Sequence, residues 1–497
     1  MEDGKTEPKR ESIYTFPLLV LALVSFVGNV DAAIQRGVLP LIGEYFSVSD
    51  RELGLLGFAF IFLNVLASIP AGWIADNYRR GRVIGYTIAS WSALSALSAA
   101  AFNYPSLLVA RGVMGFGEAL ADPAATSLIG DYFPPYSRGR GFSVQQVMFF
   151  VGQGVGLALA GYIGSRLGWR WAFLLVGMPG SLVAIMAFRL REPKRGEADL
   201  DSLKPRSENS RIPSPNSERS PHEGQGDKTM VGPRHSQLSD TFEAAGETQL
   251  SGSRKLEDPP TLGLWPFLRY AAADLIREII ALLRIRTMRY ILIGAATLLF
   301  TVQGIGYWLA VFHQRYSRMS LTKAATVTAG ILGVAGIIGT FWGGSFADRL
   351  LSKKGYAARI DMSVAMILGG AAAFFVSWIV SVVWVSIAFQ FAGVVLIATV
   401  PPTLRASVMD VVPASSRGVG TSAFALVTAV FGTALAPAVV GLLSDLTHSL
   451  RRAFILVSPP IVAGSLILWR ARFTIVQDAQ QMLALLASQG GAKRSKH

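Results

Sequence analysis

Three ionisable residues, Arg111, Glu118 and Asp122, lie within an otherwise mainly apolar run at 107–130. A charge at the centre of a membrane-spanning helix costs roughly 2.5–3.5 kcal/mol on insertion scales, so such residues persist where they face protein or water. Their spacings of seven and four place all three on one face of a continuous helix. Carboxyl groups beside an arginine in a poorly hydrated cavity can bind and release a proton as the arginine moves. The pattern therefore predicts a proton-binding site, and a structural ion pair between helices is the alternative.

Asp31 is a fourth candidate, in the apolar run at 14–36. At 1.5 Å per residue, Glu118 lies near the midpoint of its predicted span at Ala119, and Arg111 lies roughly 12 Å from that midpoint, nearer one end. The span of Asp31 runs in the opposite direction, so Asp31 falls between those two depths. Arg36 follows Asp31 by about one and a half helical turns. We therefore expect Asp31, Arg111 and Glu118 to share one cavity.

The composition is that of a membrane protein. Of the 497 residues, 51% are hydrophobic and only 16% are charged. The chain has no cysteine and only five histidines, and no grouping of nucleophile and base or of metal ligands is evident, so no enzyme activity, metal or cofactor is predicted. The net charge of +14 comes from basic residues between apolar runs, which favours contact with membrane lipids over nucleic acid.

Twelve apolar runs approach the ~20 residues that a spanning helix needs. The predicted spans are 14–36, 53–75, 83–103, 107–130, 141–165, 171–190, 289–312, 324–347, 361–380, 383–408, 419–443 and 453–470. Arginine and lysine concentrate in the loops after the second, fourth and eighth spans, and the loops after the third and ninth contain none. Because short cytoplasmic loops hold the basic residues, we predict an all-α, multi-pass protein of the cell (inner or plasma) membrane with both termini cytoplasmic.

A polar segment divides the spans into two groups of six. The predicted units are a cytoplasmic tail (1–13), an N-terminal six-helix half (14–190), a disordered cytoplasmic linker (191–260), an interfacial amphipathic helix (261–288), a C-terminal six-helix half (289–472) and a cytoplasmic tail (473–497). The linker is rich in Ser, Pro, Glu and Lys, which disfavours a packed core. The amphipathic helix is predicted from apolar residues that recur on one helical face.

The two halves carry an internal repeat. DYFPPYSRGRGFS at 131–143 aligns without a gap with DVVPASSRGVGTS at 410–422, and GWIAD at 72–76 matches GSFAD at 344–348. A third pair, RWAF and RRAF, occupies the equivalent place near the end of each half. Three ordered matches indicate two parallel repeats related by an axis along the membrane normal, which places a binding site at their interface.

These motifs resemble those of the major facilitator superfamily. GWIADNYRRGR at 72–82 is similar to its signature loop between spans 2 and 3, and GSFADR at 344–349 to the second copy. The resemblance implies twelve helices, alternating access, and charge clusters that hold the cytoplasmic end closed in the outward-facing state, with Asp76 and Asp348 each facing an arginine. The alternative is that these charges only set the topology. The predicted gate residues are Gly72, Asp76, Arg80, Arg82, Arg138, Gly344, Asp348, Arg349 and Arg417.

Within that superfamily, RGVMGFGEA at 111–119 and the aspartate ahead of GVLP in the first span are similar to the spinster-like transporters. In that family, the first-span aspartate and the fourth-span arginine and glutamate are associated with proton coupling. The resemblance implies this role for Asp31, Arg111 and Glu118.

Two positions depart from the family pattern. Ala32 stands where the family commonly has an arginine, with Arg36 further along the helix, and Asp122 stands where a small polar residue is usual. We include Arg36 and Asp122 among the proton-coupling candidates.

Other polar and aromatic side chains within the spans are candidates to line the substrate path. They are Gln35, Gln146, Gln153, Gln303, Tyr307, Trp308 and Gln390. Each is equally compatible with an interhelical hydrogen bond or an aromatic residue at the lipid interface.

The expected function is secondary active transport by alternating access, coupled to protons. The spinster resemblance implies a lysolipid-like substrate, whose anionic head group Arg36 or Arg111 could bind, and a small organic anion fits these arginines equally well. A drug substrate, or a non-transporting receptor or scaffold, is the alternative. The expected partners are the small-molecule or lipid substrate, protons and membrane lipids, and the chain is expected to act as a monomer.

Overall fold

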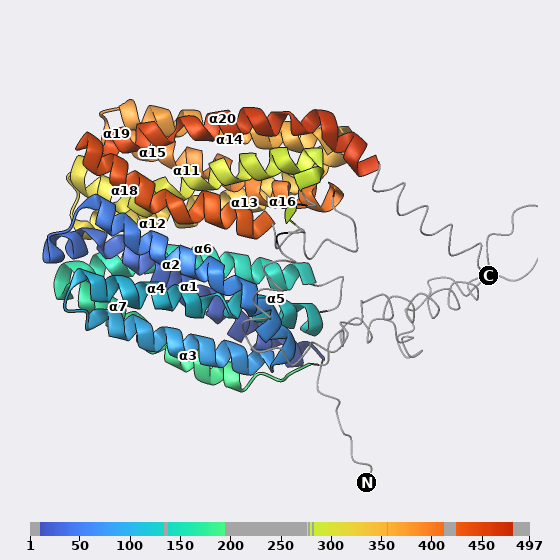
Figure 1. Ribbon diagram of the computed structural model, residues 1–497. Coiled ribbons are helices and arrows are strands. Elements are labelled where there is room, and N and C mark those ends of the chain that lie inside the picture. Colours follow the sequence, from blue (N-terminus) through green and yellow to red (C-terminus); the bar gives the residue numbers. More distant parts are fainter. Residues whose placement is uncertain are drawn as a thin grey trace, which may run out of the picture.

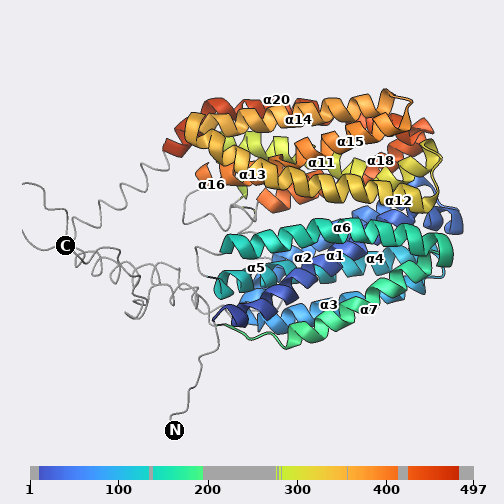
Figure 2. The same ribbon diagram turned by 180° about the vertical axis from the view of Figure 1, so that it is seen from behind.

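The computed structural model describes residues 10–133, 138–193, 276, 279–280, 283–354, 356–411 and 424–480, and all regular secondary structure in these residues is helical. Two bundles of roughly parallel helices lie side by side (Figure 1, Figure 2). We call them the N-half (10–193) and the C-half (286–480). The end at which α1 begins, α7 ends and α11 begins is the linker end, and the opposite end is the far end.

The N-half contains seven helices in its described residues. They are α1 (Arg10–Phe46), α2 (Asp50–Asn77), α3 (Arg80–Ala99), α4 (Tyr104–Glu118), α5 (Ala121–Tyr132), α6 (Arg138–Leu167) and α7 (Trp169–Phe188).

The C-half is built from longer runs that are interrupted by π-helical turns or short breaks. Its elements are α11 (Arg286–Tyr316), α12 (Leu321–Ala329), η1 (Gly330–Val334), α13 (Ala335–Lys354), α14 (Tyr356–Ile379), α15 (Val383–Ala398), α16 (Val400–Val411), η3 (Ala429–Ala434), α18 (Leu435–Thr447), α19 (Leu450–Val457) and α20 (Pro459–Trp469). Residues 471–480 are also helical.

In the described residues, 10 helical runs are long and apolar enough to cross a membrane. They coincide with ten of the predicted spans and confirm a helical, multi-pass fold. The third predicted span forms α3, but its two arginines and four serines reduce its hydropathy. The fourth is divided into helices of 15 and 12 residues. Twelve spans and cytoplasmic termini therefore remain predictions, and α1 is longer at both ends than the predicted 14–36.

The division of the fourth span has a local cause. α4 ends at Glu118 and α5 begins at Ala121. Pro123 has no N–H to donate to the carbonyl of Ala119, which favours a break at this point. The expectation that Glu118 and Asp122 share one face of a continuous helix therefore does not hold. Instead, Asp122 lies in the first turn of α5, where the helix dipole stabilises a carboxylate.

Side-chain caps begin two N-half helices at the far end. Ser49 accepts a hydrogen bond from the Glu52 N–H, and the Glu52 carboxylate accepts one from the Ser49 N–H at 2.8 Å. Asn103 and Ser106 form the equivalent reciprocal pair at the start of α4. The first of these caps fixes Asp50 in the first turn of α2, beside the C-half.

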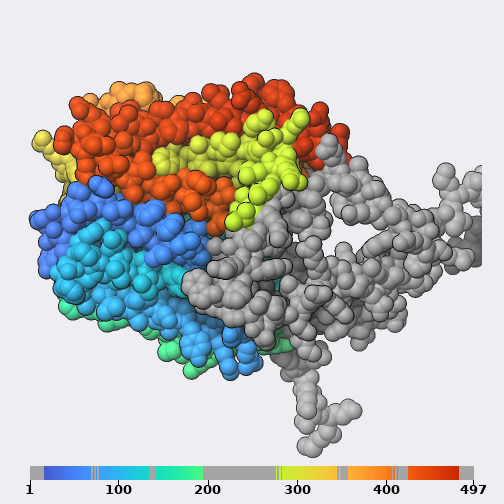
Figure 3. Space-filling model, in the orientation of Figure 1, coloured from blue at the N-terminus to red at the C-terminus, as the bar shows by residue number. Residues whose placement is uncertain are grey.

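The two halves contact each other through α2 with α18, α6 with α12, and α1 with α11. Glycines permit this close approach. A Cβ on Gly54 would lie 2.4 Å from the Pro437 carbonyl oxygen, and one on Gly161 would lie 2.7 Å from Ala325 Cβ. Both contacts lie toward the far end, where the surfaces of the two halves meet (Figure 3). Within the described residues, the halves are therefore closed against each other at this end.

Candidate functional site

The centre of the N-half contains a buried ion pair. Arg111 Nη2 on α4 lies 3.0 Å from Asp31 Oδ2 on α1, and each side chain is only 1% exposed. Ser95 on α3 donates a hydrogen bond to Asp31 Oδ1 at 2.6 Å. Three helices of one half thus converge on the carboxylate, and two of the predicted coupling residues are in direct contact.

Arg111 is held on every side. Its Nε donates to Gln35 Oε1 at 2.6 Å, and its guanidinium lies 5.0 Å from the ring centroid of Phe173 and 5.6 Å from that of Phe60. Cation–π contacts of this kind are stronger when the cation is desolvated. The arginine therefore occupies a prepared site inside the N-half, and Asp31 supplies its negative charge.

The polar path continues from Gln35 into the C-half. Gln35 Nε2 donates to the hydroxyl of Tyr307 on α11 at 3.1 Å, and that hydroxyl donates to the Leu53 carbonyl on α2 at 3.0 Å. Gln35 and Tyr307, both predicted as substrate-lining residues, thus connect the Arg111 site to the other half.

Glu118 interacts electrostatically with this pair, and its side chain forms no hydrogen bond with the described residues. Its Oε2 is buried and has no hydrogen-bond partner among the described residues. The charges of Asp31, Arg111, Arg36 and Asp122 all act on it electrostatically. The other four coupling candidates thus all interact electrostatically with Glu118, and the shared cavity expected for Asp31, Arg111 and Glu118 remains a prediction.

Arg36 and Asp122 differ from the central pair in their surroundings. Arg36 is half-buried, interacts electrostatically with Tyr307 and Glu118, and forms no hydrogen bond or ion pair that involves the described residues. Asp122 is exposed, and it interacts electrostatically with Arg405 of the C-half. Each thus interacts electrostatically with a group of the C-half.

A cavity of about 230 Å³ lies between the halves, away from the far-end contacts. Its lining includes Gln146 and Phe150 of α6, Thr340 and Phe341 of α13, and Pro402 of α16. The lining is mainly apolar and contains hydroxyl and amide groups but no charged side chain. Gln146 is thus a predicted lining residue that the structure places on a cavity.

The remaining lining candidates lie elsewhere. Trp308 is fully buried and donates from Nε1 to the Pro437 carbonyl at 3.0 Å, and Gln390 is fully buried and donates to Ser386 Oγ at 3.1 Å. Both bonds join residues of the C-half. Gln153 and Gln303 are half-buried.

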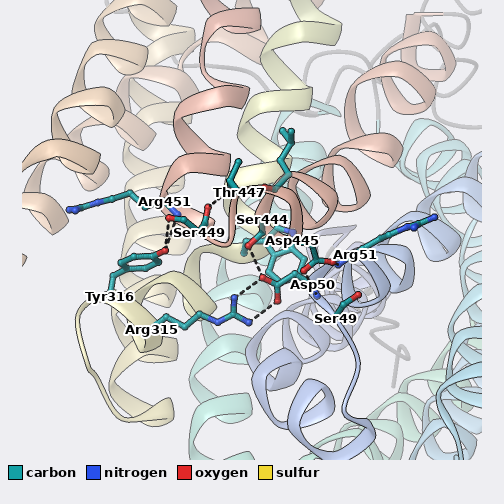
Figure 4. Close-up of polar contacts among 12 residues, drawn as sticks. Ser49, Asp50, Arg51, Arg315, Tyr316, Ser444, Asp445, Thr447, Ser449 and Arg451 are labelled. Atoms are coloured by element: carbon teal, nitrogen blue, oxygen red, sulfur yellow. Dashed lines mark hydrogen bonds and ion pairs between the residues drawn. The ribbon is translucent and has the colours of Figure 1, made fainter.

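A cluster at the far end joins the two halves (Figure 4). Both terminal nitrogens of the Arg315 guanidinium, Nη1 and Nη2, donate to the Asp50 carboxylate, at 2.6 and 2.7 Å, and Ser444 Oγ donates to Asp50 Oδ2 at 2.7 Å. The Asp445 carboxylate accepts from the N–H groups of Asp50 and Arg51, at 3.1 and 2.8 Å. We call these five residues the far-end cluster. The sequence analysis did not predict this cluster. The one local indication in the sequence was Asp50, the acidic residue that directly follows the Ser49 cap.

The gate prediction is only partly covered by the described side chains. Arg82 is exposed, and Arg80 is buried, pairs with Asp131 and with Glu192 at 2.7 Å, and donates to the Pro193 carbonyl at 3.0 Å. This cluster lies within the N-half. The side chains of Gly72, Asp76, Arg138, Gly344, Asp348 and Arg349, and all of Arg417, lie outside the description, so the contacts proposed for them remain predictions.

Comparison with known proteins places this geometry in a family context. A model of the Major Facilitator Superfamily matches residues 21–437. The chain is 30% identical to human Protein spinster homolog 1 over 196 residues, which cover 38% of this chain and 37% of the relative. It is 28% identical to the D-galactonate transporter of Escherichia coli O6:H1 over 205 residues, which cover 40% of this chain and 47% of the relative. Each match thus spans less than half of the relative.

Two solved structures resemble the whole fold. Both are of a bacterial homologue of the human lysosomal transporter Spinster in inward-facing conformations, one occupied and one unoccupied. Their TM-scores are 0.70 and 0.69, with 19% and 20% sequence identity, and each alignment covers 95% of this chain and 99% of the other. At this identity the likeness shows the fold and leaves the substrate open.

Proposed function

Because the chain belongs to the Major Facilitator Superfamily, we propose that it is a proton-coupled secondary transporter that alternates access to the space between its halves. The observation that carries the proposal is the buried Asp31–Arg111 pair beside Glu118, whose Oε2 lacks a hydrogen-bond partner among the described residues. A carboxyl group in such surroundings can hold a proton, and a guanidinium that moves toward it favours release. Protonation and conformation can then change together.

We also propose an orientation and a membrane. If both termini are cytoplasmic, as the basic loops suggest, the far end faces outward and the cavity near α6 and α13 lies toward the cytoplasm. The described conformation is then inward-facing, in a protein of the cell membrane. The two Spinster homologue structures are both inward-facing, which is consistent with this proposal.

The proposed substrate is an anion with an apolar part. Phe150 and Phe341 give the cavity an apolar lining, and Thr340 and Gln146 supply neutral hydrogen-bonding groups. Arg36, which has no ion pair with the described residues, is available for an anionic group, whereas Arg111 is already paired. The spinster relatives favour a lysolipid-like amphipath. The D-galactonate transporter, by its name, favours a small organic acid.

Uptake into proteoliposomes under an imposed pH gradient tests the proposal. A lysophospholipid and D-galactonate serve as the two probes, after a thermal-stabilisation screen at two pH values. We expect one probe to be taken up faster with the gradient than without it. We expect Glu118→Gln to abolish this acceleration while exchange of substrate without a gradient continues, because the amide cannot exchange a proton.

Glu44→Gln is the matched control, since Glu44 is an exposed glutamate at the far end of α1. It should retain the response of the unmodified protein. Equal uptake with and without the gradient, or a Glu118→Gln variant with the normal response, would contradict the proposed coupling. Uptake of neither probe would exclude both proposed substrates.

A further inference from the structure

We propose that the hydroxyl of Tyr307 is the link through which the Asp31–Arg111 pair stabilises the closed far end. Tyr307 is then a positioning residue, because it acts on the equilibrium between closed and open halves through Gln35. The inference rests on the proposed alternating-access function, and it adds a specific route from the charged pair of the N-half to the C-half.

An unbroken set of polar contacts defines this route. Arg111 Nε donates to Gln35 Oε1 at 2.6 Å, Gln35 Nε2 donates to Tyr307 at 3.1 Å, and Tyr307 donates to the Leu53 carbonyl at 3.0 Å. Asp31, Gln35, Arg111 and Tyr307 are all buried, with at most 5% of each residue exposed. Water therefore has little access to these hydrogen bonds while the halves are closed.

The carboxamide of Gln35 gives the route a direction. Its oxygen accepts from Arg111 and its NH₂ group donates to Tyr307, and an amide presents these two groups on different sides. Arg111 thus fixes which side of Gln35 meets the phenol. If Asp31 loses its charge, Arg111 is no longer held by it, and Gln35 loses the contact that orients its donor toward Tyr307.

Tyr307 is well placed to report this change to the far end. It belongs to the C-half, whereas its partners Gln35 and Leu53 belong to the N-half. Its ring packs on Gly57 of α2, where a Cβ would lie 2.7 Å from a ring carbon. Leu53 lies one helical turn beyond Asp50, so the hydroxyl forms a second layer of contacts beneath the far-end cluster.

A thiol-labelling experiment measures the opening directly. The chain contains no cysteine, so Ala325→Cys gives the full-length protein a single thiol. Ala325 is fully buried on α12, against Gly161 of the N-half. A maleimide should therefore react at this position mainly when the halves separate. For purified protein in detergent, the labelling rate then reports the fraction of open molecules.

We expect Tyr307→Phe to raise the labelling rate at least about fivefold, because the hydroxyl makes two hydrogen bonds to the N-half and one hydrogen bond usually contributes about 1 kcal/mol net. Gln35→Met removes the same link from the other side and should have a similar effect. Asp31→Asn should also accelerate labelling. The double variant Asp31→Asn/Tyr307→Phe should be no faster than the faster single variant, because both changes interrupt one route.

Tyr316→Phe is the matched control. It removes a hydroxyl from the same helix, but the partners of that hydroxyl, Ser449 Oγ at 2.9 Å and the Arg451 N–H at 3.3 Å, both lie in the C-half. Its labelling rate should equal that of the parent protein. Equal acceleration by Tyr316→Phe, an unchanged rate in Tyr307→Phe, or a double variant whose rate rises by the product of the two single factors would overturn the inference.

Two further features keep the test decisive. If Tyr307→Phe does not fold, as judged by size-exclusion chromatography and thermal unfolding, Gln35→Met examines the same link. Labelling requires no transport and no pH gradient. A negative labelling result would therefore not contradict proton-coupled uptake. A normal pH response in Glu118→Gln would not contradict the proposed link through Tyr307.

Discussion

At the scale of single residues, Ser95 determines how the Asp31 carboxylate is satisfied. Its hydroxyl donates to Oδ1 at 2.6 Å inside the N-half, and the serine is 1% exposed. Removing one hydrogen-bond partner of a buried polar group lowers the free energy of unfolding by about 1–3 kcal/mol, and by more when the group is charged. We expect Ser95→Ala to lower the thermal unfolding temperature in detergent, measured by intrinsic fluorescence.

Ser98→Ala provides the comparison on the same helix. Ser98 is fully buried, but its hydroxyl donates to the Leu94 carbonyl of its own helix at 2.9 Å. Its loss removes a local bond and leaves no carboxylate unsatisfied. If Ser98→Ala lowered the thermal unfolding temperature as much as Ser95→Ala, the effect of Ser95 would come from general packing and not from its bond to Asp31.

The sequence predicted part of this residue-level picture. The depth argument placed Asp31 between the depths of Arg111 and Glu118, because the rise of a helix fixes depth in a span, and the structure brings Asp31 into contact with Arg111. It did not identify Ser95 as the third partner, since a serine in an apolar helix commonly bonds to its own backbone, as Ser98 does.

At the scale of elements, the break between α4 and α5 separates two of the acidic candidates. Pro123→Ala would supply an N–H that can bond to the Ala119 carbonyl and continue the helix. We expect amide hydrogen exchange at residues 120–124 to slow about tenfold, as measured by mass spectrometry of the peptide that covers them. The added bond would also change how Asp122 is presented relative to Glu118.

Pro105→Ala tests whether any proline loss has this effect. Pro105 lies in the first turn of α4, where its missing N–H has no helical partner to bond. Exchange in α4 should remain unchanged. If exchange at 120–124 is equally fast with and without Pro123, the proline does not cause the break.

The elements also show why sequence reasoning fails locally. Pro123 was visible, but an apolar run of spanning length predicts one helix, and a proline inside such a helix can produce either a kink or a break. α1 tolerates Pro17 and Pro40 without interruption, so the outcome depends on which neighbours satisfy the freed carbonyl.

At the scale of the whole molecule, the far-end cluster joins the two halves in the described conformation. Asp50→Asn removes the charge that binds Arg315 while it preserves the shape of the side chain. Hydrogen bonds to charged groups stabilise a folded structure by about 1.5–3 kcal/mol each. The contribution of Arg315 is smaller, because its side chain is partly exposed and water screens its charge. We expect spin labels at Glu44→Cys and Lys323→Cys, exposed sites on opposite halves, to shift toward longer distances in electron–electron double resonance.

The control removes a carboxylate from an ion pair inside one half. Asp361 pairs with Arg472 at 3.2 Å within the C-half, so Asp361→Asn should leave the distance distribution unchanged. A similar lengthening in both variants would mean that the far-end cluster has no specific role in closure.

Contacts between the halves were the least predictable feature. The repeat indicated that the two halves face each other and that the interface contains the site, but it did not fix which residues meet. Gln35 and Tyr307 are 272 positions apart, and Asp50 and Arg315 are 265 apart. Each pairing depends on the rotation of one rigid half against the other, which the helical periodicity within either half does not encode.

The bond between Asp445 and the start of α2 has a consequence for how the molecule opens. Two of the backbone N–H groups that a helix leaves unpaired at its beginning are here completed by a carboxylate from the opposite half. Separating the halves must therefore leave the first turn of α2 incomplete. If the halves alternate as proposed, their separation is partly a local folding reaction, in which the first turn of α2 loses and regains these two hydrogen bonds.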